Sequence, residues 1–363
     1  MLAARTPLAP LTTLNVGGPA RWFVRATSVE QVRAAVTEAA ERDIPLFVLG
    51  GGSNLVVADA GIDGLVLQIG LHGQHGKLRG HDTILAAAAG ESWDAVVEAA
   101  VRDGLGGIEC LSGIPGTVGG TPVQNVGAYG QEVSQVIESV SVIDRHTGSA
   151  QELNASDCQF AYRMSRFKGA DKDRFIVTGV TFRLRHESPT LAYPDLIAYM
   201  NEHAIMSPDV RDVRNAVLAI RRRKGMVLDP ADADTRSVGS FFMNPVVTLA
   251  THAAVGEIAR KPAPSFPARE GHVKLPAAWL IERAGFVRGH AAGAVGLSRK
   301  HPLAIVNRGG ATARDVVRLA VEIKRAVAGT FGVELRTEPV FAGFDDDPDV
   351  AYLSQGPNVD TAD

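Results

Sequence analysis

A loop rich in glycine and proline most constrains what this 363-residue chain can fold into. It runs from Ser112 to Gly130, reads SGIPGTVGGTPVQNVGAYG, and contains six glycines and two prolines. Such a stretch makes a poor helix or strand, because glycine loses the most backbone freedom on ordering and proline donates no hydrogen bond. Its bare N–H groups can converge on an anion, and it contains no lysine or arginine. The loop therefore predicts a pyrophosphate site made by backbone dipoles.

A second glycine loop, Gly50 to Asn54, lies between two apolar runs, Ile44–Leu49 and Leu55–Val57, that are typical of short buried strands. Taken alone, it is more often explained as a tight turn than as a ligand site. The presence of two such loops in one chain favours the interpretation that they form a ligand site. The sequence has no G-x-x-x-x-G-K-[ST] motif, and no G-x-G-x-x-G motif opens a helix after a first strand. A bound dinucleotide would therefore use neither a P-loop nor an ordinary Rossmann site.

Composition excludes several classes of function. The net charge of −3 and the absence of a basic run argue against a nucleic-acid partner, and no apolar run reaches the roughly 18 residues of a membrane span. The first ten residues lack a signal-peptide core, so we expect a cytoplasmic protein. Cys110 and Cys158 are expected to be reduced thiols. No cysteine and histidine spacing matches a zinc site, and no structural metal is expected.

The hydrophobic pattern predicts an α+β protein with a boundary near Gly225. Residues 226–237 resemble a linker, and the acidic, polar tail at 345–363 is expected to be disordered. The expected helices are 28–42, 92–103, 209–224, 277–284 and 313–331, and the expected strands are 44–49, 55–57, 65–69, 83–89, 136–144, 175–185 and 303–306.

Three polar residues in apolar surroundings could carry chemistry: Arg163, Ser240 and Glu338. Arginine offers a fixed fork for a carboxylate, serine can give a proton, and a carboxylate in an apolar site can have its pKa raised. Together they could bind and protonate an acidic, unsaturated substrate. Taken singly, each has a commoner structural explanation, namely an ion pair, a turn serine and a surface residue. Tyr193 and Lys224 are likewise, by default, a turn residue and a solvated helix-end charge.

The same segments, in this order, resemble the UDP-N-acetylenolpyruvoylglucosamine reductases, flavoenzymes of peptidoglycan precursor synthesis. The resemblance covers the chain from Asn15 to Glu338. Its most specific pieces are Ile114-Pro115-Gly116, Asn125-Val126-Gly127-Ala128-Tyr129-Gly130, Tyr162-Arg163, and Gly239-Ser240-Phe241-Phe242 with Asn244-Pro245. The family tends to have proline before its catalytic glutamate, where this chain has Thr337.

The resemblance implies non-covalently bound FAD on a fold like that of the vanillyl-alcohol oxidases (the PCMH type), spanning about residues 17–188. It implies flavin-binding subdomains at 1–72, joined by a returning segment 336–344, and at 73–224, and an α+β substrate-binding domain at 225–335. The residues implied to hold FAD are Gly50, Gly51, Gly52, Ser53, Asn54, Ile114, Pro115, Gly116, Thr117, Gly119, Gly120, Asn125, Gly127, Ala128, Tyr129 and Gly130.

By the same resemblance, NADPH gives a hydride to FAD, and the reduced cofactor then passes it to UDP-N-acetylglucosamine enolpyruvate to form UDP-N-acetylmuramate. Arg163 and a protonated Glu338 would polarise the substrate carboxylate, and Ser240 would protonate the resulting carbanion. Tyr193, Lys224 and Asn244 would contact the substrate, chiefly its diphosphate. We expect a monomer. Two alternatives remain: a flavin- or nucleotide-sugar-binding protein without turnover, and an oxidase of the same flavin fold.

Overall fold

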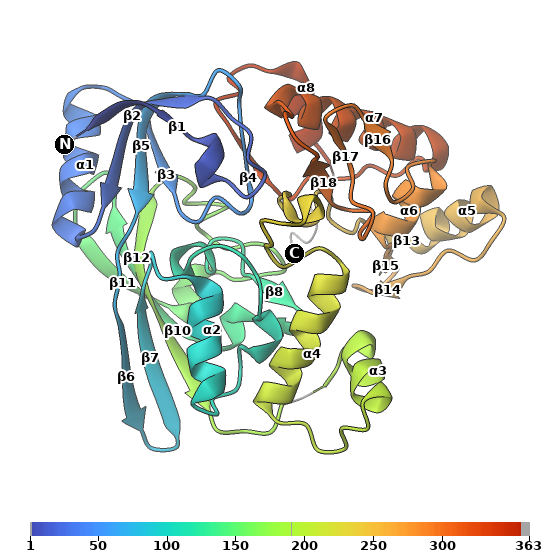
Figure 1. The fold of residues 1–363 in the computed structure, drawn as a ribbon, viewed down its shortest axis with the longest axis horizontal. Coiled ribbons are helices and arrows are strands. Elements are labelled where there is room, and N and C mark those ends of the chain that lie inside the picture. The colour runs from blue at the N-terminus through green and yellow to red at the C-terminus, as the bar shows by residue number, and fades with distance from the viewer. Residues whose placement is uncertain (1, 190, 357–363) are drawn as a thin grey trace. The chain divides into compact units, whose positions relative to one another are not determined.

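A computed structural model describes residues 2–189 and 191–356 of the chain (Figure 1). Their contacts divide them into two compact units, which are described separately. The first unit comprises the described residues within Met1–Thr6, Ala20–Gly51 and Asp63–Val227. The second comprises Pro7–Pro19, Gly52–Ile62 and the described part of Leu228–Asp363. The second glycine loop is thus divided, because Gly50 and Gly51 belong to the first unit and the next three residues to the second.

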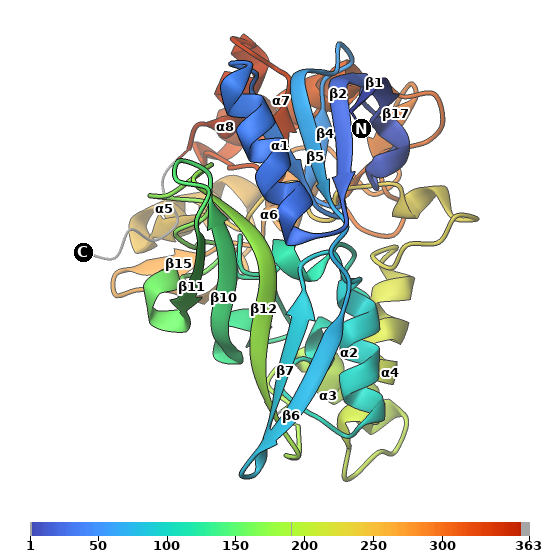
Figure 2. The ribbon, with the colours of Figure 1, turned by 90° about the vertical axis from the view of Figure 1, so that its left-hand side faces the viewer.

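A four-stranded sheet and one helix form the N-terminal part of the first unit. The helix begins where expected, because the Ser28 side chain accepts a hydrogen bond from the Gln31 N–H and caps its first turn. It buries Val32 and Val36 in the same core as Leu65 and Leu67 of the sheet. Figure 2 shows the helix lying against this sheet. The helix is α1 (Val29–Glu41), and the sheet, in spatial order, is β1 (Ala3–Pro7), β2 (Pro19–Ala26), β5 (Ile62–Ile69) and β3 (Leu46–Leu49).

A five-stranded antiparallel sheet forms the other part of this unit. Helix α2 packs on it through Trp93, whose ring centroid lies 5.7 Å from that of Phe182. Helix α4 lies beside α2 on the same side of the sheet (Figures 1 and 2). In spatial order the strands are β11 (Ala150–Asn154), β10 (Ile137–Asp144), β12 (Phe175–Arg185), β7 (Asp82–Ala88) and β6 (Gln74–Arg79). The helices are α2 (Trp93–Arg102), α3 (Pro194–Glu202) and α4 (Val210–Arg223), and a small hairpin consists of β8 (Gly127–Ala128) and β9 (Gln131–Glu132).

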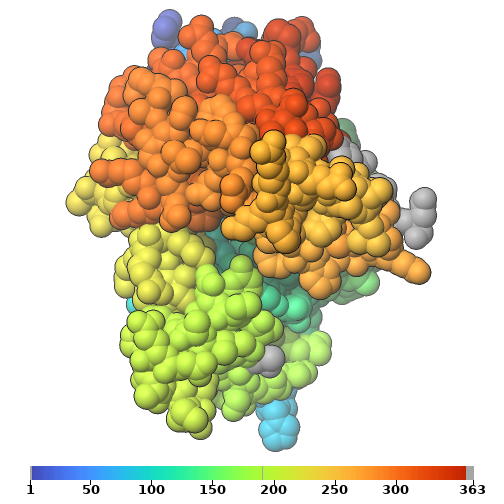
Figure 3. Space-filling view, turned by 90° about the vertical axis from the view of Figure 1, so that its right-hand side faces the viewer, coloured from blue at the N-terminus to red at the C-terminus, as the bar shows by residue number. Residues whose placement is uncertain are grey.

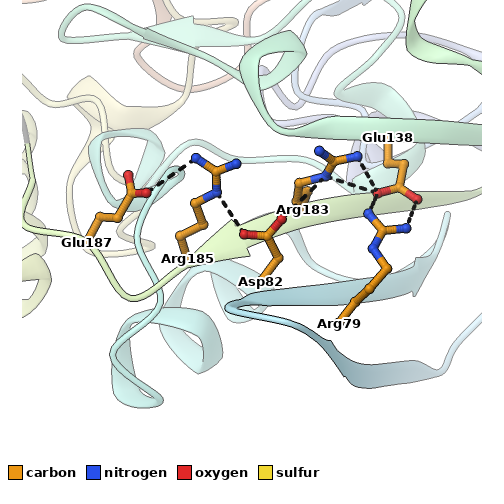
Figure 4. A network of polar contacts seen from close by, with 6 residues as sticks. All are labelled: Arg79, Asp82, Glu138, Arg183, Arg185 and Glu187. Atoms are coloured by element: carbon orange, nitrogen blue, oxygen red, sulfur yellow. Dashed lines mark hydrogen bonds and ion pairs between the residues drawn. The ribbon is translucent and has the colours of Figure 1, made fainter.

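An ion-pair network fastens the edge strand β6 to this sheet (Figure 4). Glu138 accepts hydrogen bonds from Arg79 and Arg183, and Asp82 accepts one from Arg185 at 2.8 Å. Every residue of β6 is exposed, and charged side chains on an edge strand discourage pairing with another chain. The network consists of Arg79, Asp82, Glu138, Arg183, Arg185 and Glu187.

The second unit is built around the long helix α7 (Ala313–Phe331), which Thr312 and Asp315 cap with a reciprocal pair of hydrogen bonds. β19 (Val340–Ala342) runs parallel to β4 (Leu55–Val57) in the same unit. Helix α5 lies on the outside, drawn in gold in Figure 3, and buries only Val255. The other elements are β13 (Val246–Thr248), α5 (Leu249–Ala259), β14 (Phe266–Pro267), β15 (His272–Lys274), α6 (Ala277–Arg283), β16 (Ala291–Ala292), β17 (Val295–Leu297), β18 (Ile305–Asn307) and α8 (Pro348–Ser354).

One sequence-based expectation about the second unit is wrong. Residues 348–354 form helix α8, whose Leu353 is fully buried, although the tail from residue 345 was expected to be disordered. Asp347 caps this helix by accepting the N–H groups of Asp349 and Val350. The two units divide between Val227 and Leu228, within the stretch 226–237 that resembled a linker. This stretch is ordered, because Asp234 is buried and accepts a hydrogen bond from Arg299 Nε at 3.0 Å. Residues 357–363 of the expected tail lie outside the described residues.

Helix α8 is held by a buried lysine, and this contact predicts a loss of stability. The Lys324 side chain is fully buried, and its Nζ donates to the carbonyl oxygens of Tyr352, at 2.6 Å, and of Gln355. In Lys324→Met these acceptors at the end of α8 lose their donor. Each unsatisfied buried polar group costs about 1–3 kcal/mol, so we expect the free energy of unfolding to fall by about 3 kcal/mol.

Urea denaturation measures this change, and the matched control is Arg318→Met, which makes the same kind of replacement at an exposed position of α7. Equal stability of the two variants would contradict a holding role for Lys324. Protease cleavage between residues 345 and 356 should also become faster in Lys324→Met alone.

No helix within residues 2–189 and 191–356 is long and apolar enough to cross a membrane. Both cysteines are free and buried. Burial raises the pKa of the Cys110 thiol to about 12 and that of Cys158 to about 11, so neither thiol is activated as a nucleophile.

Candidate functional site

The two glycine loops meet in the first unit. A Cβ atom added to Gly51 would lie 2.6 Å from the Gly116 Cα atom, and one added to Gly50 would lie 3.1 Å from Thr117 Oγ1. The two backbones therefore approach each other more closely than any side chain would permit. Two segments far apart in the sequence, both predicted to contact a pyrophosphate, thus form one backbone surface.

Hydrogen bonds to α2 and the strand before it fix the longer loop. Trp93 N–H donates to Gly116 O at 3.1 Å, and Gly119 N–H donates to Ala89 O at 2.9 Å. Gly120 N–H donates to Thr117 O at 3.0 Å. Because these N–H groups of Gly119 and Gly120 bind within the protein, the two glycines provide a close approach rather than hydrogen-bond donors. Backbone N–H donors for a pyrophosphate are therefore to be sought among the loop residues that precede Gly119.

The start of the longer loop is held by Asp94 and Arg214. Asp94 Oδ1 accepts hydrogen bonds from Gly113 N–H and from Arg214 Nη1, both at 2.6 Å. Burial by itself would raise the pKa of Asp94, but these hydrogen bonds from Arg214 and Gly113 outweigh it and lower the pKa below its usual value. An ionised Asp94 thus ties the N-terminal part of α2 and the glycine loop to α4.

Asp94→Asn is expected to destabilise the protein in a pH-dependent manner. Since the folded pKa of Asp94 is lowered, its contribution to stability is present above the unfolded value of about 4 and is lost as the pH falls below it. The Asp94 side chain is 37% exposed, so after allowance for solvent screening we expect a loss of only about 1–2 kcal/mol at pH 7. Urea denaturation at pH 7 and pH 3 checks this; a difference between wild type and variant that did not shrink at pH 3 would contradict it.

The β8–β9 hairpin positions Arg163. Tyr129 and Gly130 form its turn with φ values of +53° and +85°, and Gly127 O accepts a hydrogen bond from Arg163 Nη2 at 2.8 Å. Asn125, also assigned to the cofactor, is buried and donates to Glu132 Oε2 at 2.9 Å and to Ala161 O at 3.0 Å. The Asn125 side chain thus joins this hairpin to the turn that carries Arg163.

The predicted substrate residues Tyr193 and Lys224 lie at two helix ends in the same unit. Tyr193 immediately precedes α3, and its ring meets that of Tyr129 edge to face, with centroids 5.2 Å apart. Lys224 ends α4, and its Nζ lies 2.7 Å from Asp195 Oδ2. Burial raises the pKa of Tyr129 to about 12, so this ring remains a neutral phenol at physiological pH. The arrangement places a lysine and two tyrosines close to one another.

Sequence reasoning missed Arg221, whose Nη2 donates to Gly113 O at 3.3 Å and to Met226 O at 2.7 Å. Burial lowers the pKa of this guanidinium, and its Nε atom has no hydrogen-bond partner among the described residues. An unpaired buried donor beside the glycine loop fits a site for an anionic cofactor. The sequence contained one indication, because Arg221 follows Val217 by four residues and therefore lies on the same side of α4 as that buried valine.

Ser240 and Glu338 come together in the second unit. Glu338 N–H donates to Phe241 O at 3.0 Å, and Phe242 pairs with Thr337 as an isolated antiparallel bridge. Phe241 and Phe242 are fully buried, which anchors the segment on which Ser240 lies. Gly239, with φ of +77°, makes the turn before it. The structure therefore places the backbone of the predicted general acid beside that of the predicted carboxylate.

Asn244, the third predicted substrate residue, follows the same segment. Its Oδ1 accepts a hydrogen bond from Ala277 N–H at 2.9 Å and so satisfies a donor at the start of α6. The predicted catalytic residues thus fall into two groups, with Arg163 in the first unit and Ser240 and Glu338 in the second.

Comparisons with known proteins show which family the chain resembles. A model described as "FAD binding domain" matches residues 20–154, and one described as "UDP-N-acetylenolpyruvoylglucosamine reductase, C-terminal domain" matches residues 229–342. The crystal structure of the reductase from Thermus caldophilus is similar with a TM-score of 0.64 and 27% identity, covering 94% of this chain and all of that one.

Relatives with the same name match nearly the whole chain. The reductase of Thermobifida fusca is 46% identical over 351 residues, which cover 94% of this chain and 98% of the relative. The reductase of Saccharopolyspora erythraea is 50% identical over 344 residues, which cover 92% of this chain and 93% of the relative. The reductase of Mycobacterium tuberculosis H37Rv is 48% identical over 358 residues, which cover 94% of this chain and 95% of the relative. On this evidence the chain belongs to the UDP-N-acetylenolpyruvoylglucosamine reductase family, with the FAD-binding α+β fold that the resemblance implied.

Proposed function

We propose that this protein catalyses the FAD-dependent reduction of UDP-N-acetylglucosamine enolpyruvate to UDP-N-acetylmuramate, with NADPH as hydride donor. The observation that carries the proposal is the full-length match to reductases of this name, together with the pairing of the Ser240 and Glu338 segments. When bound, FAD would supply the two-electron chemistry that links NADPH to the vinyl group of the substrate.

The residues of the two glycine loops fit the pyrophosphate of FAD. Gly50, Gly51, Gly116 and Thr117 make a surface without bulky side chains, and the Arg221 guanidinium beside it adds positive charge. The space beside Gly120 is open to a ligand, since no atom lies within 4 Å of a Cβ placed on this residue. Of the other residues assigned to FAD, Asn125 supports the Arg163 turn, and Gly52, Ser53 and Asn54 belong to the second unit.

Three residues are proposed to act on the substrate. Arg163 and Glu338 would polarise the enolpyruvyl carboxylate, so that negative charge arising at the neighbouring carbon is stabilised. Ser240 would then donate its hydroxyl proton to that carbon. The hydroxyl of serine has a high pKa, so a strongly basic carbanion is a suitable acceptor. Buried Phe241 and Phe242 support this assignment because they limit movement of the segment that carries Ser240.

Lys224, Tyr193 and Asn244 are proposed to bind the rest of the substrate, chiefly its diphosphate. Lys224 Nζ is half exposed and paired with one carboxylate, Asp195, which a diphosphate could replace. Asn244 holds the start of α6 through its oxygen, so its amide nitrogen is the atom proposed to donate to the substrate. Tyr193 would cover the site through its ring.

We further propose a cytoplasmic monomer with the three-part division 1–72, 73–224 and 225–335. The two free, buried cysteines and the use of NADPH support the location. Size-exclusion chromatography with light scattering tests the monomer, since a mass near 38.3 kDa is expected.

The test of function is the visible spectrum of the purified protein under anaerobic conditions. Addition of NADPH should bleach the flavin band, and addition of UDP-N-acetylglucosamine enolpyruvate should restore it. Bleaching without restoration would favour a flavin-binding protein without turnover, and oxygen consumption with alcohol or sugar substrates would favour an oxidase. A protein that cannot be loaded with FAD would exclude the proposed function.

A further inference from the structure

Asn54, at the end of the second glycine loop, contacts the backbone of Glu338. Its Nδ2 donates to Glu338 O at 3.3 Å, and its own carbonyl oxygen accepts a hydrogen bond from Val340 N–H at 3.0 Å. These bonds extend the parallel pairing of β4 with β19, in which Leu55 lies opposite Val340. Asn54 therefore contacts the carbonyl side of the predicted catalytic residue.

The other side of Glu338 is held by the segment that carries Ser240. Glu338 N–H donates to Phe241 O at 3.0 Å, as described above. The backbone of Glu338 is thus fixed between Asn54 and the residue next to Ser240. Since the position of a carboxylate follows from its backbone and rotamer, a shift at Asn54 changes the place from which Glu338 acts.

Asn54 itself has little freedom. A Cβ on Gly52, two residues earlier, would lie 2.0 Å from Leu11 O, and Gly52 O accepts a hydrogen bond from Thr13 N–H at 3.0 Å. Thr13 Oγ1 also donates to Ser237 O at 2.6 Å, three residues before Ser240. Hydrogen bonds within the second unit therefore connect the end of the glycine loop with the segments that carry Ser240 and Glu338.

We propose that Asn54 is a positioning residue for Glu338, and that it links the end of the cofactor loop to the carboxylate that polarises the substrate. This inference rests on the proposed catalytic role of Glu338. It assigns the Asn54 side chain to substrate reduction rather than to retention of FAD. Loss of its amide donor should therefore affect one half-reaction and spare the other.

The experiment compares wild type, Asn54→Ala, Glu338→Gln and the double variant, each saturated with FAD. Three quantities are measured: the dissociation constant for FAD, the rate of bleaching by NADPH, and the rate of flavin reoxidation by UDP-N-acetylglucosamine enolpyruvate. A displacement of about 1 Å at a catalytic group can cost about 10²-fold in rate. Asn54→Ala should thus slow reoxidation by about 10–10²-fold, with FAD affinity and bleaching rate unchanged.

The double variant decides whether Asn54 acts through Glu338. If it does, the double variant should be reoxidised no more than about twofold more slowly than Glu338→Gln alone, because the group that Asn54 positions has already been altered. Full additivity, or weaker FAD binding with equal slowing of both half-reactions, would overturn the inference. Asn54→Asp, which keeps the shape but not the donor, provides the same test if the alanine variant does not fold. Failure of wild type to be reoxidised would instead overturn the proposed function.

Discussion

Ser240→Ala is expected to leave bleaching of the flavin by NADPH unchanged and to slow its reoxidation by the enolpyruvyl substrate by about 10²–10⁴-fold. The hydroxyl proton is needed only after hydride has reached the substrate, so the first half-reaction does not depend on it. Stopped-flow absorbance under anaerobic conditions measures the two rates separately. Alanine removes one oxygen atom at a position whose neighbours, Phe241 and Phe242, are fixed by burial, so the fold should be unaffected.

The matched control is Ser354→Ala, which makes the same change at the exposed end of α8 in the same unit. Both half-reactions should keep their wild-type rates in this control. If Ser240→Ala slows bleaching and reoxidation equally, Ser240 is not the proton donor. A solvent deuterium isotope effect on reoxidation, present in wild type and lost in the variant, would support the proton-transfer role independently.

Local rules predicted much of the fold. Helix α1 begins after Ser28 as expected, because a hydroxyl before an apolar periodic segment satisfies the first N–H groups of a helix. Helix α7 has the expected bounds, 313–331. The alternating pattern at 175–185 predicted β12 with its bounds. The short strands β13 to β17 were not predicted, since two or three residues carry too little periodicity to be recognised.

The site depends on contacts that local rules do not encode. The glycine content showed that both loops could bring backbone close to a partner, but only the structure shows that Gly51 and Gly116 meet each other. The bond between Glu338 N–H and Phe241 O joins residues far apart in the sequence, so spacing could not reveal it. Ser240, next to Phe241, and Glu338 were placed in one site by resemblance and not by their residue types.

Charge composition gave a wrong prediction for the segment after residue 345. The acidic run at 345–349 has the composition of a disordered segment, yet Asp347 caps α8 and pairs with Arg314. A single fully buried lysine, Lys324, also holds the end of that helix. Composition averages over such contacts, whereas the stability of a helix end depends on the particular donors and acceptors that it meets.

Gly51→Ala is expected to weaken FAD binding by about 10–10²-fold, because overpacking costs about 1–3 kcal/mol and each 1.4 kcal/mol changes a dissociation constant tenfold. The added Cβ would lie 2.6 Å from Gly116 Cα and 2.9 Å from Gly116 C. Both are backbone atoms, so no side-chain rotation can relieve the contact and the two loops must separate. The dissociation constant is measured by quenching of flavin fluorescence as FAD is added to the apoprotein.

The matched control is Gly329→Ala, because a Cβ at Gly329 meets no atom within 4 Å and the residue lies inside α7. This variant should bind FAD as wild type does, and it should be slightly more stable because alanine favours a helix. Unchanged FAD affinity in Gly51→Ala would mean that the contact between the two loops is not part of the cofactor site. Weakened binding in Gly51→Ala alone would establish that the two glycine loops, so far apart in the sequence, hold the cofactor as one surface.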